Sequence, residues 1–332
     1  MLKRITYNFV QYYFMKEYQQ ILVCGSISYD EIMDYPGRFV DQIQPDRLHQ
    51  INLSFNVDHL ERQLGGTATN IAYNLSFFTK KKIIPISVIG RDGRIFINFF
   101  KKHGIDYSHI IINKEKYTAT GKAITDLSNN QIWGYYYGPL GLAKKKKLAK
   151  IADSNSILIL SATAEEAFLA HQHDAISQKI DYMYDPGMTL PWIKKDDLKN
   201  GIIHAKWLIG NDYEISLIYK KTGLKMTDLL AKNIAIIITQ GENGVIFQDR
   251  LHKRHVPAYK VKKIVDPTGA GDAWRGGFIS AIVEEKSAVD ALIQGNAIAS
   301  FAIEKYGTVN HRPTRKQIED RMSVIKNAKV SL

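Results

Sequence analysis

The sequence predicts an α/β protein built on a mostly parallel sheet. Short runs of β-branched residues alternate with longer helical patterns from residue 21 to the end of the chain, as in a parallel sheet covered by helices. A length of 332 residues allows one large α/β unit with a small appended domain. The chain is 45% hydrophobic and 23% charged, which is typical of an ordinary soluble globular protein.

The expected strands of the main sheet are short apolar runs, each followed by a turn or capping signal. They are Ile21–Val23, Ile83–Ile89, Ile157–Leu160, Tyr182–Tyr184, Trp207–Ile209, Ile234–Thr239 and Val245–Gln248. The expected helices include Ala68–Phe78, Ile95–His103, Ala273–Glu284 and Val289–Glu304.

Two stretches, 29–60 and 110–138, interrupt this alternation of strands and helices. In the second stretch, Ala119–Leu127 and Gln131–Tyr137 alternate in the way that antiparallel strands do. We expect both stretches to contribute to one small sheet. This lid would lie over the carboxyl edge of the main sheet, where open α/β folds bind ligands.

Several classes of protein are excluded or disfavoured. The longest apolar runs are far shorter than the roughly 20 residues that span a membrane, so we expect no membrane partner. The single cysteine, Cys24, excludes an intrachain disulfide and fits a reducing cytoplasm, where we expect the protein. Residues 1–18 lack the apolar core of a secretion signal and are predicted to form a disordered N-terminal extension without chemistry.

The net charge of +12 favours anionic partners, and both nucleotides and nucleic acid qualify. No Gly-x-x-x-x-Gly-Lys-Ser/Thr motif is present, so a P-loop enzyme in its usual form is excluded.

The most informative segment is Asp266–Phe278, which passes from a strand end through a glycine turn into a helix. Gly269 and Gly271 allow unusual backbone angles and leave N–H groups uncovered, so the turn can bind an anion. The positive end of the helix adds to this effect. Asp272 could then accept a proton from a hydroxyl that attacks a bound phosphoryl group. Taken alone, the segment fits an ordinary glycine turn with Asp272 as N-cap equally well or better.

A second glycine pair, Gly65 and Gly66, opens another helix, with Asn70 about one turn in. A ligand could lie directly on this backbone, although a double glycine before a helix is also a common loop.

Asn211 and Glu214 follow the buried strand Trp207–Ile209. An Asn followed three residues later by Glu is a capping-box pattern, which is favoured on local grounds. In the functional interpretation, the same two side chains hold water and Mg²⁺ beside nucleotide phosphates.

The segment Ile238–Val245 reads as a strand, a glycine turn and a second strand. The simpler interpretation is a hairpin. The functional one lets Thr239 and the backbone of Gly241 approach a nucleotide.

In this order, the four segments resemble the ribokinase-like family of sugar and nucleoside kinases, the phosphofructokinase-B group, over about residues 20–325. The resemblance implies one kinase domain with three α/β/α layers and a β-sheet lid. It implies an anion hole and a catalytic base, placed at Gly269, Ala270, Gly271 and Asp272. Substrate contacts are implied at Ser26, Asp30, Gly65, Gly66 and Asn70. ATP contacts are implied at Asn211, Thr239, Gly241, Gly244 and Asn296, with Mg²⁺ held by Glu214 through water.

A narrower resemblance is carried by Tyr35–Phe39 and Leu53–Asp58, which are similar to the lid of bacterial adenosine kinases of the mycobacterial type. Those enzymes phosphorylate the 5′-hydroxyl of adenosine, and their lid strands can pair two subunits. The resemblance therefore implies a role in purine salvage and a homodimer formed through the lid.

The sequence departs from this pattern where substrate identity is decided. An aromatic residue expected within 118–125 is absent, and Met188 and Thr189 replace an expected glutamine pair. Trp133 or the run Tyr135–Tyr137 could supply another surface for a base to stack on. The same rings could instead pack only within the lid.

The sequence therefore predicts an ATP- and Mg²⁺-dependent kinase that phosphorylates a primary hydroxyl of a nucleoside, with adenosine first. A kinase for ribose or fructose is the second interpretation. A non-catalytic protein of the same fold that binds nucleotide or nucleic acid is the third, and we do not expect a nucleic-acid partner.

Overall fold

The computed structural model describes residues 16–43, 52–128 and 130–328. Its centre is an eight-stranded sheet. The strands are β1 (Gln20–Cys24), β4 (Lys82–Ile86), β9 (Ser156–Ser161), β10 (Asp181–Asp185), β11 (Trp207–Asn211), β12 (Ala235–Thr239), β13 (Val245–Gln248) and β14 (Lys253–Val256). Their order is β14-β13-β12-β11-β10-β9-β1-β4. Neighbours from β12 to β4 pair in parallel, and β13 and β14 pair antiparallel at one edge.

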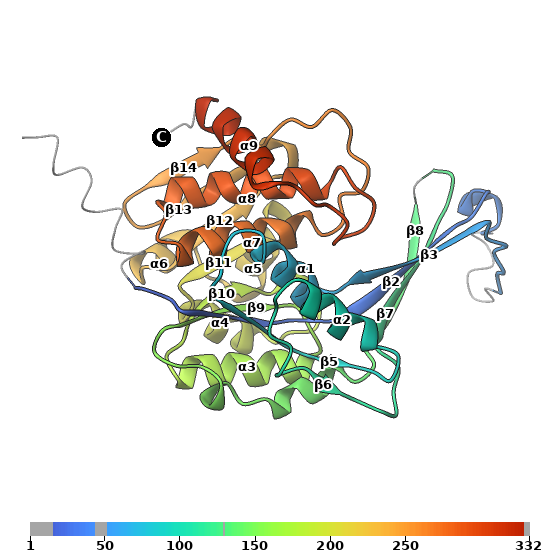
Figure 1. Cartoon of the computed structure of the whole chain (residues 1–332), viewed down its shortest axis with the longest axis horizontal. Helices are drawn as coiled ribbons and strands as arrows, with labels where there is room; N and C mark the ends of the chain where they lie inside the picture. Colours follow the sequence, from blue (N-terminus) through green and yellow to red (C-terminus); the bar gives the residue numbers. More distant parts are fainter. Residues whose placement is uncertain (1–15, 44–51, 129, 329–332) are drawn as a thin grey trace, which may run out of the picture.

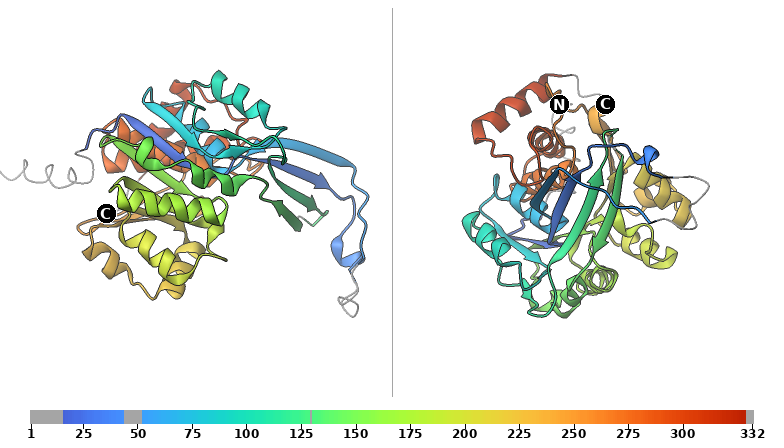
Figure 2. Two further views of the ribbon diagram at one scale, coloured as in Figure 1. Left: turned by 90° about the horizontal axis from the view of Figure 1, so that it is seen from below. Right: turned by 90° about the vertical axis from the view of Figure 1, so that its right-hand side faces the viewer.

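Helices cover both faces of this sheet (Figures 1 and 2). One face packs against α1 (Thr67–Leu75), α2 (Arg94–Lys102), α7 (Ala270–Val283), α8 (Ala288–Ala302) and α9 (Arg315–Asn327). The other packs against α3 (Glu165–Ser177), α4 (Lys195–Ile203), α5 (Asp212–Thr222) and α6 (Met226–Ala231). Successive residues of a strand point into the cores on opposite faces of the sheet, because side chains alternate along a strand. Ile21 and Val23 lie in one core, and Leu22 and Cys24 in the other.

The second sheet has four strands in the order β3-β2-β7-β8 and projects from the main body (Figure 1). Its strands are β2 (Ser28–Asp34), β3 (His59–Gly65), β7 (Ala119–Thr125) and β8 (Gln131–Tyr136). A two-stranded sheet joins β5 (Val88–Ile89) to β6 (Ile111–Ile112). The four-stranded sheet, called the lid below, confirms the small separate sheet expected from the two interrupting stretches. Residues 44–51 of the first stretch lie outside the described residues.

The predicted three-layer α/β/α architecture is confirmed, although most element boundaries shift by one to three residues and two differences bear on the site. The predicted strand Ile83–Ile89 is divided at Ser87, whose hydroxyl donates to the Gly25 carbonyl at 2.7 Å. The helix expected from Ala273 begins at Ala270 instead. The glycine-rich segment therefore supplies the first turn of a helix and not only the loop before it.

The predicted N-terminal extension does not reach residue 18. Tyr18 is 1% exposed, and its hydroxyl donates to Asp181 at 2.6 Å and accepts from Lys206 at 2.9 Å. Tyr18 therefore belongs to the core, because a buried phenol needs these partners. Residues 1–15 lie outside the described part of the chain. Cys24 is buried, as expected of a core cysteine, and within the described ranges no helix is long and apolar enough to cross a membrane.

Candidate active site

Asp272 on α7 and Asn70 on α1 meet at the carboxyl edge of the main sheet. The Asn70 amide nitrogen donates to the Asp272 carboxylate at 2.8 Å. The amide oxygen of Asn70 accepts from the hydroxyl of Thr308 at 2.7 Å, which fixes the orientation of the amide. The structure thus joins the two glycine-opened helices that the sequence identified separately, and it adds Thr308, which the sequence did not indicate.

The surroundings of Asp272 adjust its proton affinity. Burial raises the pKa of Asp272 to about 6, against the positive charge of Arg275 and the hydrogen bond from Asn70, which lower it. The carboxylates of Asp185 and Glu214 act in the same direction as burial. A carboxylate with a pKa of about 6 is ionised near neutral pH and is a stronger base than an ordinary aspartate.

The start of α7 provides an anion site beside this carboxylate. Gly269 is the N-cap in the left-handed region, with φ 77°, and a side chain there would collide with Thr308. Gly271, by contrast, has no positive φ and lies within the first turn. Its lack of a side chain leaves space for Arg275, whose Nη1 is 2.7 Å from where a Cβ would be. The first N–H groups of a helix have no partner inside the helix, so they are available to a phosphate.

A cavity of about 240 Å³ lies in front of this helix start. Four predicted site residues line it, namely Gly269, Gly271, Asp272 and Glu214. Met188, which the sequence placed among the positions that decide substrate identity, also lines it. The remaining lining residues were not predicted, and they are Thr67, Ser161, Ala162, Asp185, Gly187 and Arg275. Two of these carried a usable signal in the sequence. Asp185 ends a buried strand, and Arg275 lies three residues after Asp272, on the same side of the helix.

Asn211 and Glu214 form the capping box of α5. The Asn211 side chain accepts from the Glu214 N–H, and the Glu214 carboxylate accepts from the Asn211 N–H, each at 2.8 Å. The structural interpretation of this pair is therefore confirmed. Glu214 also lines the cavity. Among the described residues, no group of three His, Cys, Asp or Glu side chains could hold a metal ion, so a single carboxylate fits only an ion that keeps most of its water, as Mg²⁺ does.

The predicted substrate residues surround the start of α1. Gly66 is the N-cap at φ 89°, and a side chain at Gly65 would collide with the carboxylate of Asp30. Ser26 accepts from the Thr67 N–H at 3.1 Å. Burial, together with the charges of Asp272 and Asp266, raises the pKa of Asp30 to about 7. The two carboxylates Asp30 and Asp272 therefore influence each other.

The lid presents aromatic rings on the same side as Asp30. A Cβ at Gly121 on β7 would be 3.1 Å from the Trp133 ring, 3.3 Å from the Tyr135 ring and 3.5 Å from the Asp30 carboxylate. The Tyr135 phenol also interacts with the hydroxyl of Ser28. The absence of a side chain at Gly121 therefore lets the two rings and the Asp30 carboxylate approach this strand closely, and these rings are the alternative stacking surface that the sequence suggested.

The predicted ATP residues fall into two groups. Asn211 and Thr239 are register partners at the ends of β11 and β12, and Gly241 follows in the turn with open space around its Cα. Gly244 meets a different need, because a side chain there would collide with the backbone at Val256. The predicted hairpin between β12 and β13 is confirmed.

Asn296 is held by internal hydrogen bonds. Its amide nitrogen donates to the carbonyls of Val256 and Pro257 at 3.0 and 2.9 Å, and its oxygen accepts from the Trp274 indole at 2.8 Å. Both hydrogens of the amide are therefore used within the fold. Its predicted contact with ATP does not follow from this arrangement.

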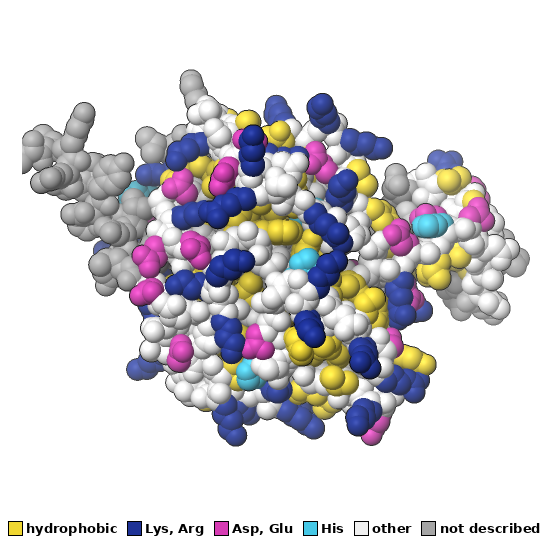
Figure 3. Space-filling model, viewed as in Figure 1, with side chains coloured by type: hydrophobic (Ala, Val, Ile, Leu, Met, Phe, Trp, Pro, Cys, Tyr) yellow, Lys and Arg dark blue, Asp and Glu magenta, His cyan; other side chains and the backbone are white. Residues whose placement is uncertain are grey.

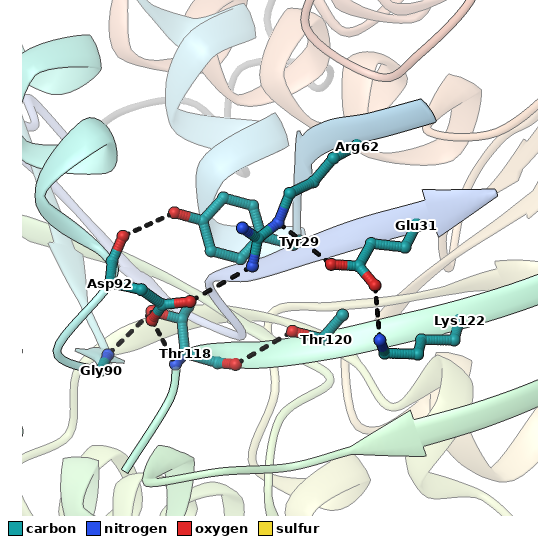
Figure 4. Close-up of polar contacts among 8 residues, drawn as sticks. All are labelled: Tyr29, Glu31, Arg62, Gly90, Asp92, Thr118, Thr120 and Lys122. Carbon is teal, nitrogen blue, oxygen red and sulfur yellow. Dashed lines mark hydrogen bonds and ion pairs between the residues drawn. The ribbon is translucent and has the colours of Figure 1, made fainter. Parts of the chain in front are cut away.

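A polar network fastens the lid to the main body (Figure 4). The Asp92 carboxylate accepts from the N–H and hydroxyl of Thr118, each at 2.7 Å, and from Arg62 at 3.2 Å. Arg62 also pairs with Glu31 at 3.1 Å, and its guanidinium covers the Tyr29 ring. These contacts connect β2, β3 and β7 to the turn before α2. A cavity of about 520 Å³ borders this network on the side that carries Tyr29 and Arg62, away from Asp272.

Comparison with known proteins agrees with this geometry. Residues 25–315 match the pfkB family of carbohydrate kinases. The chain belongs to this family of kinases. A nucleoside kinase of Methanocaldococcus jannaschii is 27% identical over 285 residues, which are 83% of this chain and 91% of the relative.

The structure of a Burkholderia thailandensis nucleoside kinase in complex with inosine resembles this pfkB-family chain with a TM-score of 0.83. It is 29% identical, and the match covers 94% of this chain and 100% of that one. The same kinase in complex with ADP-inosine gives a TM-score of 0.78, at 29% identity over 94% of this chain and 97% of that one. The fold, with its small separate sheet, and the assignment to a family of kinases are therefore established, as the resemblance implied.

Proposed function

We propose that this kinase transfers a phosphoryl group from ATP to the primary hydroxyl of a nucleoside, with adenosine as the first substrate to test. The observation that carries the proposal is the pairing of Asp272 with Asn70 beside the uncapped start of α7. A base with a raised pKa, an anion site and a cavity beside them are the parts that phosphoryl transfer to an alcohol requires.

In the proposed reaction, Asp272 accepts the proton of the substrate hydroxyl as its oxygen attacks the γ-phosphorus of ATP. The bond from phosphorus to the β,γ-bridging oxygen breaks, and ADP leaves with that electron pair. The N–H groups at the start of α7, after Gly269, bind the oxygens of the phosphoryl group while it moves. Asn70 orients Asp272 and donates to its ionised form.

Mg²⁺, when bound, would neutralise part of the charge of the phosphates. Glu214 is the residue that fits this role, because it lines the cavity and its cap interaction fixes its position. It would contact the ion through water, since the described residues offer no cluster of three ligands.

The lid supports a nucleoside as the acceptor. Trp133 and Tyr135 lie over Gly121 and are 48% and 41% exposed, and a flat base can stack on such rings by apolar and quadrupole contacts. The Asp30 carboxylate lies beside the same glycine, where it can accept hydrogen bonds from ribose hydroxyls. The related kinase that binds inosine is consistent with a purine nucleoside.

A free sugar is the second candidate. Asp30 and Asn70 would contact hydroxyl groups, which ribose and fructose share with a nucleoside. Met188, which stands where a glutamine is expected in an adenosine kinase, lines the cavity and is 77% exposed. Basic side chains are spread over the face seen in Figure 3, with acidic ones among them. That distribution does not favour a nucleic-acid groove, which clusters its positive charge.

A substrate panel with ATP and Mg²⁺ tests the proposal. Adenosine, inosine, guanosine, cytidine, ribose and fructose would be compared by ADP release and by identification of the phosphorylated product. We expect the highest kcat/KM for a purine nucleoside and a product phosphorylated on its primary hydroxyl. A preference for ribose or fructose would instead establish the sugar kinase.

The Asp272→Asn variant tests the base in the same assay. We expect kcat to fall about 10²- to 10⁴-fold while ATP binding is retained. Asp320→Asn on α9, which is exposed and does not line the cavity, is the matched control and should keep full activity. Near-normal kcat in Asp272→Asn would refute the assignment of the base.

A further inference from the structure

Arg275 is a buried cation in the catalytic cavity with no role in the function described above. Its side chain is 9% exposed and forms an ion pair with Asp185 at 2.5 Å. The second carboxylate oxygen of Asp185 accepts from the Ser161 hydroxyl at 2.6 Å. Both oxygens of Asp185 are thus engaged, and the guanidinium is held in one place at the end of β10.

Arg275 has more hydrogen-bond donors than its protein partners use. A guanidinium carries five N–H groups. The printed contact with Asp185 comes from Nη2, and within the described part of the chain Nε is buried without any partner. Nη1 lies against Gly271 at the start of α7. A buried cation with unused donors is costly, so its persistence in the cavity points to a ligand that completes its bonding.

The position of Arg275 indicates which ligand this is. It lies three residues after Asp272 on the same helix, and both line the cavity with Gly269 and Gly271. The phosphoryl group that moves to the substrate must lie between the base and the helix start. Arginine binds phosphate oxygens well, because its planar fork can donate two parallel bonds.

We propose that Arg275 is a further catalytic residue, which binds the oxygens of the transferred phosphoryl group, and that Asp185 is the positioning residue that holds it. The proposal rests on the phosphoryl transfer proposed above. It adds a positive side chain to an anion site that otherwise consists of backbone N–H groups. It also explains why the cavity tolerates an acidic base next to an incoming triphosphate.

Arg275 and Asp185 act on Asp272 in opposite directions. The charged groups that face Asp272 are Arg275 on its own helix, Asp185 on β10, Glu214 on α5 and Asp30 on β2. The positive charge of Arg275 lowers the pKa of Asp272, whereas the negative charge of Asp185 raises it. The two members of one ion pair therefore predict opposite shifts, which simple damage to the fold would not produce.

Binding of nucleotides tests the contact independently of any acceptor. The probes are ADP and a non-hydrolysable ATP analogue with a methylene β,γ-bridge, each with Mg²⁺, measured by calorimetry. For Arg275→Met we expect the analogue to bind at least about 10-fold more weakly, since a hydrogen bond to a charged group contributes about 1.5–3 kcal/mol. ADP should bind within about two-fold of wild type, because it lacks the group that Arg275 contacts.

Kinetics with the preferred acceptor test the catalytic role. We expect Arg275→Met to lower kcat about 10²-fold or more, as loss of one donor to developing charge does, with a small change in acceptor KM. The acid limb of its pH profile should move to higher pH. In Asp185→Asn the acid limb should move to lower pH. Arg275→Lys, which keeps the charge but not the fork, should be intermediate in kcat.

The outcomes separate this inference from the proposed function. If Arg275→Met weakens binding of the ATP analogue and not of ADP, the phosphate contact is supported. If the wild type also transfers phosphate to none of the acceptors, the proposed function is wrong while the contact stands. The role of Arg275 would be overturned if Arg275→Met weakened the binding of ADP and of the analogue equally. It would also be overturned if the acid limbs of the pH profiles of Arg275→Met and Asp185→Asn moved in the same direction. If Arg275→Met does not fold, the Asp185→Asn/Arg275→Met double variant removes the buried pair as a unit, and the same nucleotide comparison decides.

Discussion

Asn70 donates to the carboxylate of Asp272 at 2.8 Å, although the two residues are 202 positions apart. The bond links the first helix of the main body to the helix that carries the base. The Thr308 hydroxyl donates to the amide oxygen of Asn70 at 2.7 Å. The amide nitrogen of Asn70, and not its oxygen, therefore faces Asp272. The base is therefore oriented by two elements that are distant in sequence.

Replacing Asn70 with alanine should reduce turnover while ATP still binds. The ionised form of Asp272 loses a donor that favours it, so its pKa should rise and kcat near neutral pH should fall about 10-fold or more. Steady-state kinetics measures the effect. Asn310→Ala is a matched control, since this amide bonds to Gln63 on the exposed side. Equal losses in both variants would contradict an orienting role for Asn70.

The activity should fall on the acid side of neutrality. Burial raises the pKa of Asp272 to about 6 and that of Asp30 to about 7. A base works only when ionised, so activity is present above these values and is lost as the pH falls through them. The measurement is kcat/KM for the acceptor between about pH 5 and pH 9. A profile that stays flat down to about pH 5 would show that neither carboxylate has a raised pKa.

Removing the charge of Asp272 should stabilise the fold at alkaline pH. Its pKa of about 6 lies above the ordinary value of 3.8. The native state therefore binds the proton more tightly, and stability falls as the pH rises from about 4 to about 6. Two pKa units correspond to about 3 kcal/mol. Thermal unfolding of Asp272→Asn should give a higher midpoint than wild type at about pH 8 and a smaller difference at about pH 4.5.

Adding a side chain at Gly121 should weaken nucleoside binding and spare ATP. In Gly121→Val the side chain would displace the rings of Trp133 and Tyr135 and press against the Asp30 carboxylate, so we expect KM for the acceptor to rise at least about 10-fold, the effect of about 1.4 kcal/mol. Tyr135→Ala should raise the same KM. Tyr136→Ala, on the opposite face of β8, should not. If Tyr136→Ala raises the acceptor KM as much as Tyr135→Ala does, the rings act by packing within the lid and not by stacking on a base.

Weakening the attachment of the lid should also affect the acceptor. Asp92→Asn removes the charge that binds Arg62 and Thr118, so the lid should close less completely and acceptor KM should rise a few-fold, as in other lid enzymes. Asp106→Asn is the control, because Asp106 pairs with Lys82 in the main body and is 23% exposed, against 20% for Asp92. If Asp92→Asn and Asp106→Asn have the same acceptor KM, the network around Asp92 does not control closure of the lid.

The sequence predicted the strands of the main sheet because its parallel strands are nearly continuous apolar runs, such as Ile157–Leu160, and such runs are read locally. It indicated the start of α5 through the capping box of Asn211 and Glu214, but it gave no bounds for α3 to α6. The helix α3 carries polar residues on a face that the fold covers, namely His171 and Gln172, and a local pattern does not reveal such burial.

The site residues also fall into those that local sequence signals revealed and those that depend on tertiary contacts. Gly66, Gly269 and Asp272 were identified from the sequence, because glycine before a helix and an acid in its first turn are local signals. Gly271 was predicted for its backbone angles, whereas the structure shows that it makes room for Arg275. The contact of Asn296 with ATP stays a prediction, and the structure adds that its amide nitrogen donates to the carbonyls of Val256 and Pro257.

By itself, the sequence determined the α/β class, the lid as an interruption and the chemistry of the segment around Asp272. Only the tertiary structure decided how these parts are combined. It brought Asn70 to Asp272, placed Arg275 between Asp185 and the helix start, and set the aromatic rings opposite Asp30. The physical reason is that pKa values and ligand contacts depend on distances between residues far apart in the chain. Local propensity determines each element, and packing determines which side chains share a cavity.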